Sequence, residues 1–178
     1  MKELSLHILD IAQNSLTAGA SLVELSLTRR GGLLTAVIKD NGRGMTPDMA
    51  ARVTDPFTTT RTTRRVGLGL PLWKLAAEQT GGSFALESAP GVGTTVTAAF
   101  VHGHIDTPPL GDIVGTVVTL IQGAPSVDFV YRQETEDGAF ALDTRDLRRA
   151  LEDVPLDSPD VLAWVGEYLQ EQTALHPV

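Results

Sequence analysis

Residues 33–45, LLTAVIKDNGRGM, join an apolar run to an acidic, glycine-rich turn. Apolar side chains alternate through 34–38, which predicts a half-buried β-strand that runs directly into Asp40. Gly42 and Gly44 follow, and because glycine has no Cβ atom, a flat ligand can approach the backbone there. The turn therefore presents a carboxylate acceptor beside open backbone.

The segments before this turn predict a helix and a hairpin. Leu4, Ile8, Ile11, Ala12 and Ser15 recur at spacings of three and four, which predicts a helix over 3–19 with these residues on its apolar face. The opposite stripe of that helix is polar and carries Glu3, His7, Asp10, Asn14 and Thr17. Residues 21–30 and 33–40 alternate around Gly31-Gly32, as the strands of a β-hairpin do.

The segments after the turn predict two helices and a second hairpin. Thr46 and Pro47 are typical of a helix start, and a longer helix follows over 68–82 with Leu68, Leu72, Leu75 and Ala76 on its apolar face. Between them lies a threonine- and arginine-rich loop, which we expect Phe57 to anchor by packing. Residues 83–89 and 94–101 are the last two strands. This order predicts an α+β fold, a two-layer sandwich with helices on one face of a mixed, largely antiparallel sheet.

The charge distribution divides the chain into two parts. Residues 1–100 carry 10 Lys/Arg and 8 Asp/Glu, whereas residues 101–178 carry 4 and 14. The prolines at 108 and 109 are typical of a linker, so we expect two modules, 1–101 and 102–178. The second is a small α+β module with helices over 111–124, 145–154 and 158–175 and a hairpin over 127–144.

The composition excludes several classes of protein. The chain has no cysteine and no apolar run long enough to cross a membrane, and its N-terminus is charged where a signal peptide is apolar. We expect a cytoplasmic protein without a membrane partner. The acidic second module repels phosphates, so no nucleic-acid partner is expected; it favours a partner protein or a homodimer. His102 and His104 are better explained as exposed residues than as metal ligands.

Two known glycine-loop motifs do not fit this chain. Residues 67–72, GLGLPL, lack the Lys-Ser/Thr pair of a P-loop. They also lack the third glycine and the preceding strand of a dinucleotide-binding fingerprint. A glycine pair that opens a helix still offers free amide groups to an anion, and phosphate is the natural candidate.

Four segments together resemble a known family. Residues 9–21 (LDIAQNSLTAGAS), 40–45 (DNGRGM), 55–61 (DPFTTTR) and 66–100 (VGLGLPLWKLAAEQTGGSFALESAPGVGTTVTAAF) occur in this order. They resemble the ATP-binding domain shared by histidine kinases, gyrase, Hsp90 and the mismatch-repair protein MutL, whose structure is the Bergerat fold. The first segment is most similar to the mismatch-repair version, and the loop and last segment to histidine kinases. The resemblance covers about residues 3–101.

The resemblance implies an ATP site with magnesium. Asp40 would bind the adenine, Asn14 the magnesium ion, and Asp10 would stand where ATP-hydrolysing members have a glutamate that activates water. The other residues that the resemblance places at the nucleotide are Gly42, Gly44, Met45, Thr60, Arg61, Gly67, Leu68, Gly69, Leu70 and Thr94.

The reaction stays open between alternatives. An aspartate is one methylene shorter than glutamate, so the site could be a slow ATPase, or a kinase whose acceptor lies on another protein. No phosphoacceptor helix pair precedes the domain in this sequence, and autophosphorylation of the usual kind is therefore not expected. We expect a cytoplasmic regulatory kinase or slow ATPase that transfers the γ-phosphoryl group to a protein or to water. The alternative is an ATP-dependent switch that binds its partner through the second module.

Overall fold

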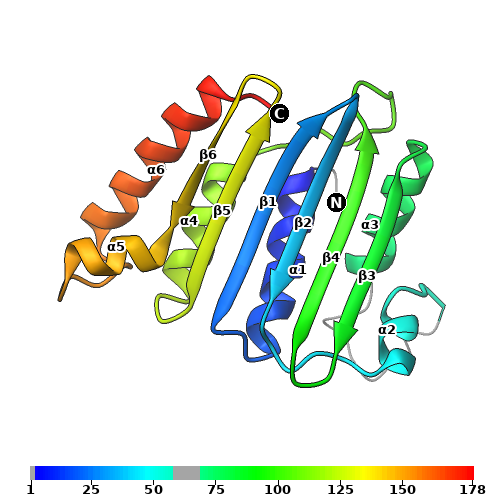
Figure 1. Ribbon diagram of the computed structural model, residues 1–178, viewed down its shortest axis with the longest axis horizontal. Coiled ribbons are helices and arrows are strands. Elements are labelled where there is room, and N and C mark those ends of the chain that lie inside the picture. Colours follow the sequence, from blue (N-terminus) through cyan, green and yellow to red (C-terminus); the bar gives the residue numbers. More distant parts are fainter. Residues whose placement is uncertain (1–2, 58–68) are drawn as a thin grey trace.

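The computed structural model describes residues 3–57 and 69–178. In these residues a single sheet of six strands lies against a layer of helices (Figure 1). The strands stand in the order β3-β4-β2-β1-β5-β6. Their bounds are β1 Leu22–Arg30, β2 Leu33–Asp40, β3 Ser83–Ala89, β4 Gly93–Val101, β5 Asp128–Thr135 and β6 Gly138–Asp143. The helices are α1 Leu4–Thr17, α2 Pro47–Val53, α3 Gly69–Gln79, α4 Ile113–Gly123, α5 Thr144–Leu151 and α6 Pro159–Leu175. The predicted α+β class and its mixed sheet are confirmed.

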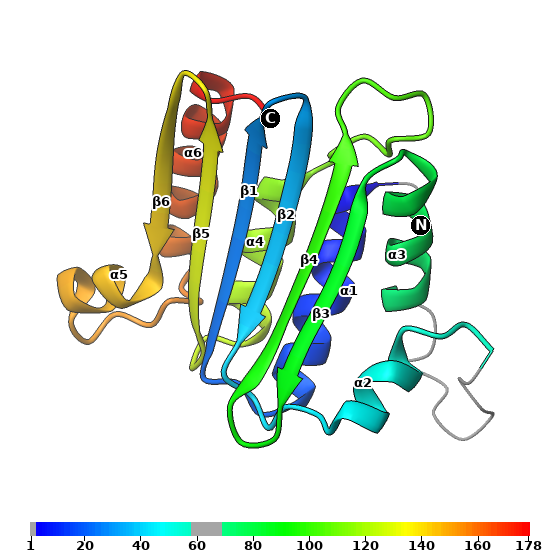
Figure 2. The ribbon, with the colours of Figure 1, turned by 45° about the vertical axis from the view of Figure 1, so that its right-hand side comes forward.

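The sheet places the last residue of β2 beside the start of β4. β2 pairs antiparallel with β1 and with β4, and in the second pairing Asp40 stands opposite Thr94. β1 pairs parallel with β5, which is the one parallel contact among the described strands. Helices α1, α3, α4 and α6 lie on the same side of the sheet, which leaves its other face open (Figure 2). Alternate residues of each strand therefore point into the core, as the burial of Leu34, Ala36 and Ile38 shows.

The predicted helix starts and faces are partly confirmed. The apolar face expected for α1 is buried, and the Thr46 hydroxyl accepts a hydrogen bond from the Met49 N–H, as an N-cap does. His7 is a correction, because it lies 2% exposed against the Trp73 ring with which it stacks, and not on a solvated stripe. At His7, the polar stripe of α1 therefore faces helix α3.

The expected apolar face of α3 is wrong for its two leucines, whereas Ala76 is half-buried against the core and Leu68 lies outside the described residues. Leu72 and Leu75 are 40% and 50% exposed, whereas Leu70, Trp73 and Ala77 are buried. The cause is the indole of Trp73, which fills the space between α1 and the Phe100 ring of β4 and so fixes the rotation of the helix. Burial of the largest side chain outweighs the two leucines on the other face.

The sheet and the core continue into residues 102–178. β5 adds to the edge of β1, and the core includes Ile113, Val117 and Leu120 of α4 together with residues of α1. The chain between them also returns to α1, because the first N–H groups of that helix, those of Leu4 and Ser5, donate to the Pro109 and Leu110 carbonyls. The strands on both sides of the linker thus belong to one sheet.

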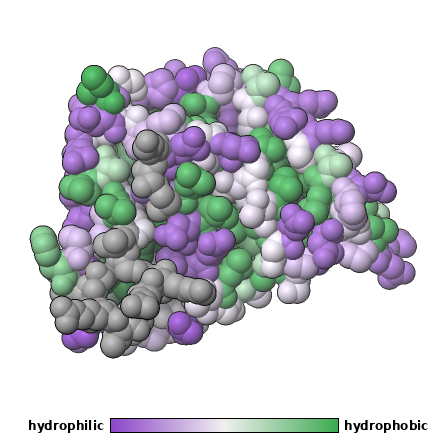
Figure 3. Space-filling view, turned by 180° about the vertical axis from the view of Figure 1, so that it is seen from behind, coloured by the Kyte–Doolittle hydropathy of each residue, from purple (hydrophilic) through white to green (hydrophobic). Residues whose placement is uncertain are grey.

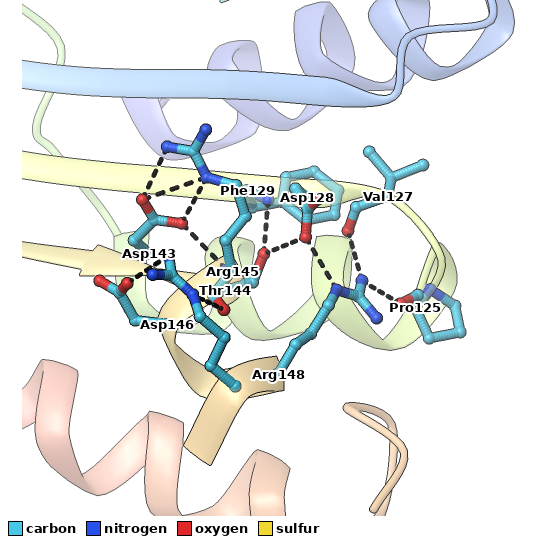
Figure 4. A network of polar contacts seen from close by, with 10 residues as sticks. Pro125, Val127, Asp128, Phe129, Asp143, Thr144, Arg145, Asp146 and Arg148 are labelled. Carbon is cyan, nitrogen blue, oxygen red and sulfur yellow. Dashed lines mark hydrogen bonds and ion pairs between the residues drawn. The ribbon is translucent and has the colours of Figure 1, made fainter. Parts of the chain in front are cut away.

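A polar network fixes α5 at the end of the hairpin β5-β6 (Figure 4). Arg148 donates to Asp128 and to the carbonyls of Pro125 and Val127, so one guanidinium holds the turn that precedes β5. Asp143 caps the helix and pairs with Arg145, whose side-chain hydrogen bond lowers the pKa of the Asp143 carboxyl. In the described part of the chain, no helix is both long and apolar enough to span a bilayer.

Candidate nucleotide-binding site

A cavity of about 170 Å³ opens between α1, the ends of β2 and β4, helix α2 and the start of α3. Its walls are mainly apolar and are formed by Ile11, Ala18, Ile38, Met45, Met49, Val53, Leu70 and Val96. Its polar lining consists of Asn14, Ser15, Thr17, Asp40, Arg43 and Thr94, together with Gly44. A slot with apolar walls and a few polar groups is the usual form of a small-molecule site.

Two donors from different parts of the chain hold the carboxylate of Asp40. The Ser15 hydroxyl of α1 donates to Oδ2 at 2.6 Å, and the Gly42 N–H donates to Oδ1 at 2.9 Å. Each carboxylate oxygen retains further acceptor capacity. Asp40 therefore presents a fixed acceptor to the cavity.

Close backbone packing explains the glycines of the turn. A Cβ at Gly42 would lie 2.9 Å from the Ala18 carbonyl oxygen. Gly44 has φ +68°, and a Cβ there would lie only 1.9 Å from the carbonyl oxygen of Ala89. The turn is also tied down on both sides, since the Arg43 N–H donates to Ala18 and its carbonyl accepts from Gly91. These contacts place the turn against α1 and the β3-β4 connection.

A second set of polar contacts joins the turn after β2 to strands β3 and β4. The Ser88 hydroxyl accepts from the Met45 N–H at 2.8 Å and lies 2.8 Å from the Thr94 hydroxyl. This contact fixes Met45 in the wall and orients Thr94, which stands beside Asp40 in the sheet. Ser88 thus supports two residues that line the cavity, Met45 and Thr94, without lining it itself.

Asp10 and Asn14 lie one turn apart on α1 and toward α3. Asn14 lines the cavity. Asp10 lies beside the start of α3, where a Cβ on Gly69 would fall 1.9 Å from its Oδ2 atom. Burial raises the pKa of the Asp10 carboxyl above its ordinary value. A carboxyl group whose pKa is raised near a cavity is a candidate for proton exchange, and Asp10 lies one turn of α1 from Asn14, which lines the cavity.

The structure brings together six of the residues expected at the nucleotide. Those that line the cavity are Asn14, Asp40, Gly44, Met45, Leu70 and Thr94. Gly42 and Gly69 do not line the cavity but are chain neighbours of the lining residues Arg43 and Leu70, and Asp10 lies against Gly69. Thr60, Arg61, Gly67 and Leu68 fall outside the described residues. The expected anchoring by Phe57 is wrong, because its ring is 93% exposed beyond a turn closed by Asp55.

Several residues at the site are not among those that the sequence predicts there. Ser15 was expected only as part of the apolar face of α1, although it follows Asn14 directly and points at the sheet. Ile38 and Val96 stand two residues from Asp40 and Thr94, so the period of two in β-strands places them in the same wall. Ser88 is opposite Thr94 in the pairing of β3 with β4. Ser88 could be found only from the register of β3 against β4, which the sequence does not give.

The fold and the site together define an ATP-binding domain of the histidine kinase-like superfamily. Residues 2–103 match the family "Histidine kinase-, DNA gyrase B-, and HSP90-like ATPase", and the chain belongs to this family. Its members are usually ATPase or kinase domains and typically bind ATP with Mg²⁺. ATP binding is implied for this chain by the family.

Curated relatives are histidine kinases that match over short regions. The chain is 28% identical over 113 residues to the cell-division control histidine kinase PdhS of Brucella anthropi, covering 56% of this chain and 11% of that protein. It is 38% identical over 72 residues to the sensor histidine kinase DcuS of Escherichia coli K12, covering 40% and 13%. It is 36% identical over 84 residues to the sensor-like histidine kinase SenX3 of Mycobacterium bovis, covering 44% and 20%. The chain thus spans at most a fifth of the length of these relatives.

A solved structure is similar over a longer stretch. The N-terminal domain of a DNA repair protein superposes with a TM-score of 0.53 at 17% identity, covering 80% of this chain and 52% of that one. This coverage exceeds the share of the chain that residues 2–103 make up, so the likeness of fold extends into the C-terminal part. At this identity the likeness shows the fold alone.

Proposed function

We propose that the cavity binds the adenine of ATP, with Asp40 as the group that recognises the base. The observation that carries this proposal is the fixed acceptor at the end of an apolar slot. The exocyclic amine of adenine is a donor, and the side chains of Ile38, Met45 and Val96 suit the faces of a flat ring. A keto oxygen in place of the amine would face the Asp40 carboxylate with no proton between them, which disfavours guanine.

The phosphates would lie toward α3 and Asn14. The first residue of α3 is Gly69, and free amide groups at a helix start favour an anion. Asn14 offers an amide oxygen from the cavity wall, which is a ligand type that Mg²⁺ accepts together with water and phosphate oxygens. When bound, the ion would neutralise the charge of the phosphates.

Asp10 would orient and deprotonate the attacking group. Its carboxylate lies at the start of α3, one turn of α1 from Asn14, and its raised pKa makes it a better base than an exposed aspartate. The attacking group is water in a slow ATPase or a side-chain hydroxyl or imidazole of a partner protein in a kinase. We favour a regulatory kinase or slow ATPase.

An ATP-dependent switch is the second candidate. The observation that favours it is the joining of the site to the C-terminal part, because α1 packs on α4 and its first N–H groups bind the Pro109 and Leu110 carbonyls. A ligand that moves α1 would therefore act on residues 102–178. In this case ATP binding changes the C-terminal part and turnover is incidental.

A measurement of phosphate release from ATP with Mg²⁺ distinguishes the kinase or slow ATPase from the ATP-dependent switch. We expect slow release that Asp10→Ala lowers by about a hundredfold, because a general base contributes on that order, and that Asn14→Ala lowers to a similar extent, because the Mg²⁺ loses a protein ligand. Glu78→Gln on the exposed side of α3 is the matched control and leaves the rate unchanged. Tight ATP binding without release in the parent chain, with or without added acceptor proteins, would favour the switch.

A further inference from the structure

The outer side of α6 combines exposed aromatic and acidic side chains. Trp164 is 49% exposed and Leu175 68% exposed, although α6 buries Val161, Val165 and Leu169 on its inner side. Asp160, Glu167 and Glu171 are exposed as well, and spacings of three and four place them on the same stripe as Trp164 and Leu175. We call these five residues the α6 stripe.

The aromatic part of this surface is rigid. The Trp164 ring stacks on Tyr168 at 5.3 Å with an interplanar angle of 7°. Tyr168 is held in turn, because its ring meets Phe140 edge-on and its hydroxyl donates to the Ala141 carbonyl of β6. One face of the indole is thus covered and fixed, and the rest faces solvent. A preorganised tryptophan loses little conformational entropy when a partner covers it.

The chain segment that carries the stripe has charges of a single sign. Residues 150–178 contain six Asp or Glu and no Lys or Arg. Seen from behind, the end of the molecule where α5 and α6 lie shows hydrophilic residues around smaller apolar areas (Figure 3). A two-fold contact of the stripe with itself would bring like charges together, so a second copy in that arrangement is disfavoured.

We propose that the α6 stripe is a docking surface for a basic segment of a partner protein. Lysine or arginine side chains of that segment pair with Asp160, Glu167 and Glu171, and a guanidinium or apolar side chain covers Trp164. Tryptophan is the aromatic residue that binds a cation best, and it is enriched among residues that dominate binding energy. This inference does not depend on the reaction at the ATP site.

The probe is a fluorescein-labelled, 18-residue amphipathic peptide of leucine, lysine and arginine, followed by anisotropy with the full chain. Its control is the same peptide with glutamate in place of every basic residue. We expect the basic peptide to bind and the acidic one not to bind. Affinity should fall as salt rises, because the Debye length shrinks.

Variants locate the contact. Trp164→Ala should weaken binding of the basic peptide at least about tenfold, as for a central interface residue. Trp164→Phe should retain most of the affinity, and Leu75→Ala, an equally exposed leucine on α3, should bind as the parent does. Glu167→Gln with Glu171→Gln should weaken binding and reduce its salt dependence.

Three results would overturn the proposal. The first is equal affinity of the parent chain and Trp164→Ala for the basic peptide, with unchanged circular dichroism. The second is equal binding of the acidic peptide, since the surface would then be only apolar. The third is a dimer in sedimentation that Trp164→Ala dissociates, because the stripe would then be an interface between copies.

Discussion

At the residue scale, the site depends on two hydrogen bonds to Asp40, one from the distant Ser15 and one from the neighbouring Gly42. Ser15 and Gly42 both donate to Asp40 and fix which directions remain for a ligand. Ser15 is 3% exposed, so its hydroxyl needs a partner inside the protein, and the Asp40 carboxylate at 2.6 Å is a closer acceptor than the Ile11 carbonyl at 3.4 Å. The acceptor is therefore rigid before any ligand arrives.

The Asp10 carboxylate should lower the stability of the fold at neutral pH, although phosphate release requires it. Its folded pKa is raised above the unfolded value of 3.8, so the folded state holds its proton more tightly. The stability that this group contributes is present below the unfolded pKa and is lost as pH rises through the folded pKa. Asp10→Asn should therefore raise the unfolding midpoint at pH 7.5 and leave it unchanged at pH 3.5, while phosphate release falls.

Thermal unfolding at the two pH values measures this effect, with Glu78→Gln as the control that changes neither midpoint. An unchanged or lower midpoint of Asp10→Asn at pH 7.5 would mean that the carboxylate is stabilised in the fold. The rate of phosphate release by the parent should also decline with falling pH as Asp10 becomes protonated.

At the element scale, turns and helix starts place the site residues. The turn after β2 passes so close to the β3-β4 connection that only glycine fits at position 44. The hairpins, the Thr46 cap and the apolar face of α1 follow from local pattern and are predictable from the sequence. The rotation of α3 was not, because a single large side chain, Trp73, outweighs the spacing of its leucines.

Gly44→Ala tests the packing of the turn against a matched glycine. Gly44 and Gly91 have similar φ values of +68° and +76°, but nothing lies within 4 Å of a Cβ at Gly91. The left-handed backbone conformation alone costs an alanine roughly 1–2 kcal/mol at either position. Because of the Ala89 carbonyl, Gly44→Ala should cost about 2 kcal/mol more than Gly91→Ala in urea unfolding, in the range of buried overpacking. Equal losses would contradict the close approach.

At the scale of the whole molecule, one sheet spans the N-terminal and C-terminal parts. The change of charge near residue 102 predicts two modules, but net charge describes the surface, whereas the pairing of β1 with β5 lies inside the fold. A parallel pairing between strands about a hundred residues apart leaves no local signal in the sequence. The ATP-binding motifs, in contrast, could be found because each is contiguous.

Removal of residues 104–178 should therefore prevent folding. The remaining chain would expose the edge of β1 and the side of α1 that packs on α4, and would lose the acceptors of the Leu4 and Ser5 N–H groups. We expect poor chemical-shift dispersion in the amide spectrum of this fragment. The control is the full chain with the four residues Gly-Ser-Gly-Ser inserted after Ile105, which is 94% exposed. We expect this variant to fold. A well-dispersed fragment that binds ATP would show that residues 1–103 fold independently.

Recognition of adenine by Asp40 can be measured by calorimetric titration of the Asp40→Asn variant with ATP and Mg²⁺. We expect its affinity to fall at least about a hundredfold, because the amine of the base loses a charged acceptor within an apolar slot. Ser15→Ala should show a smaller loss, since Asp40 keeps the Gly42 N–H. Binding of ATP by the folded Asp40→Asn variant as tightly as by the parent would contradict the account.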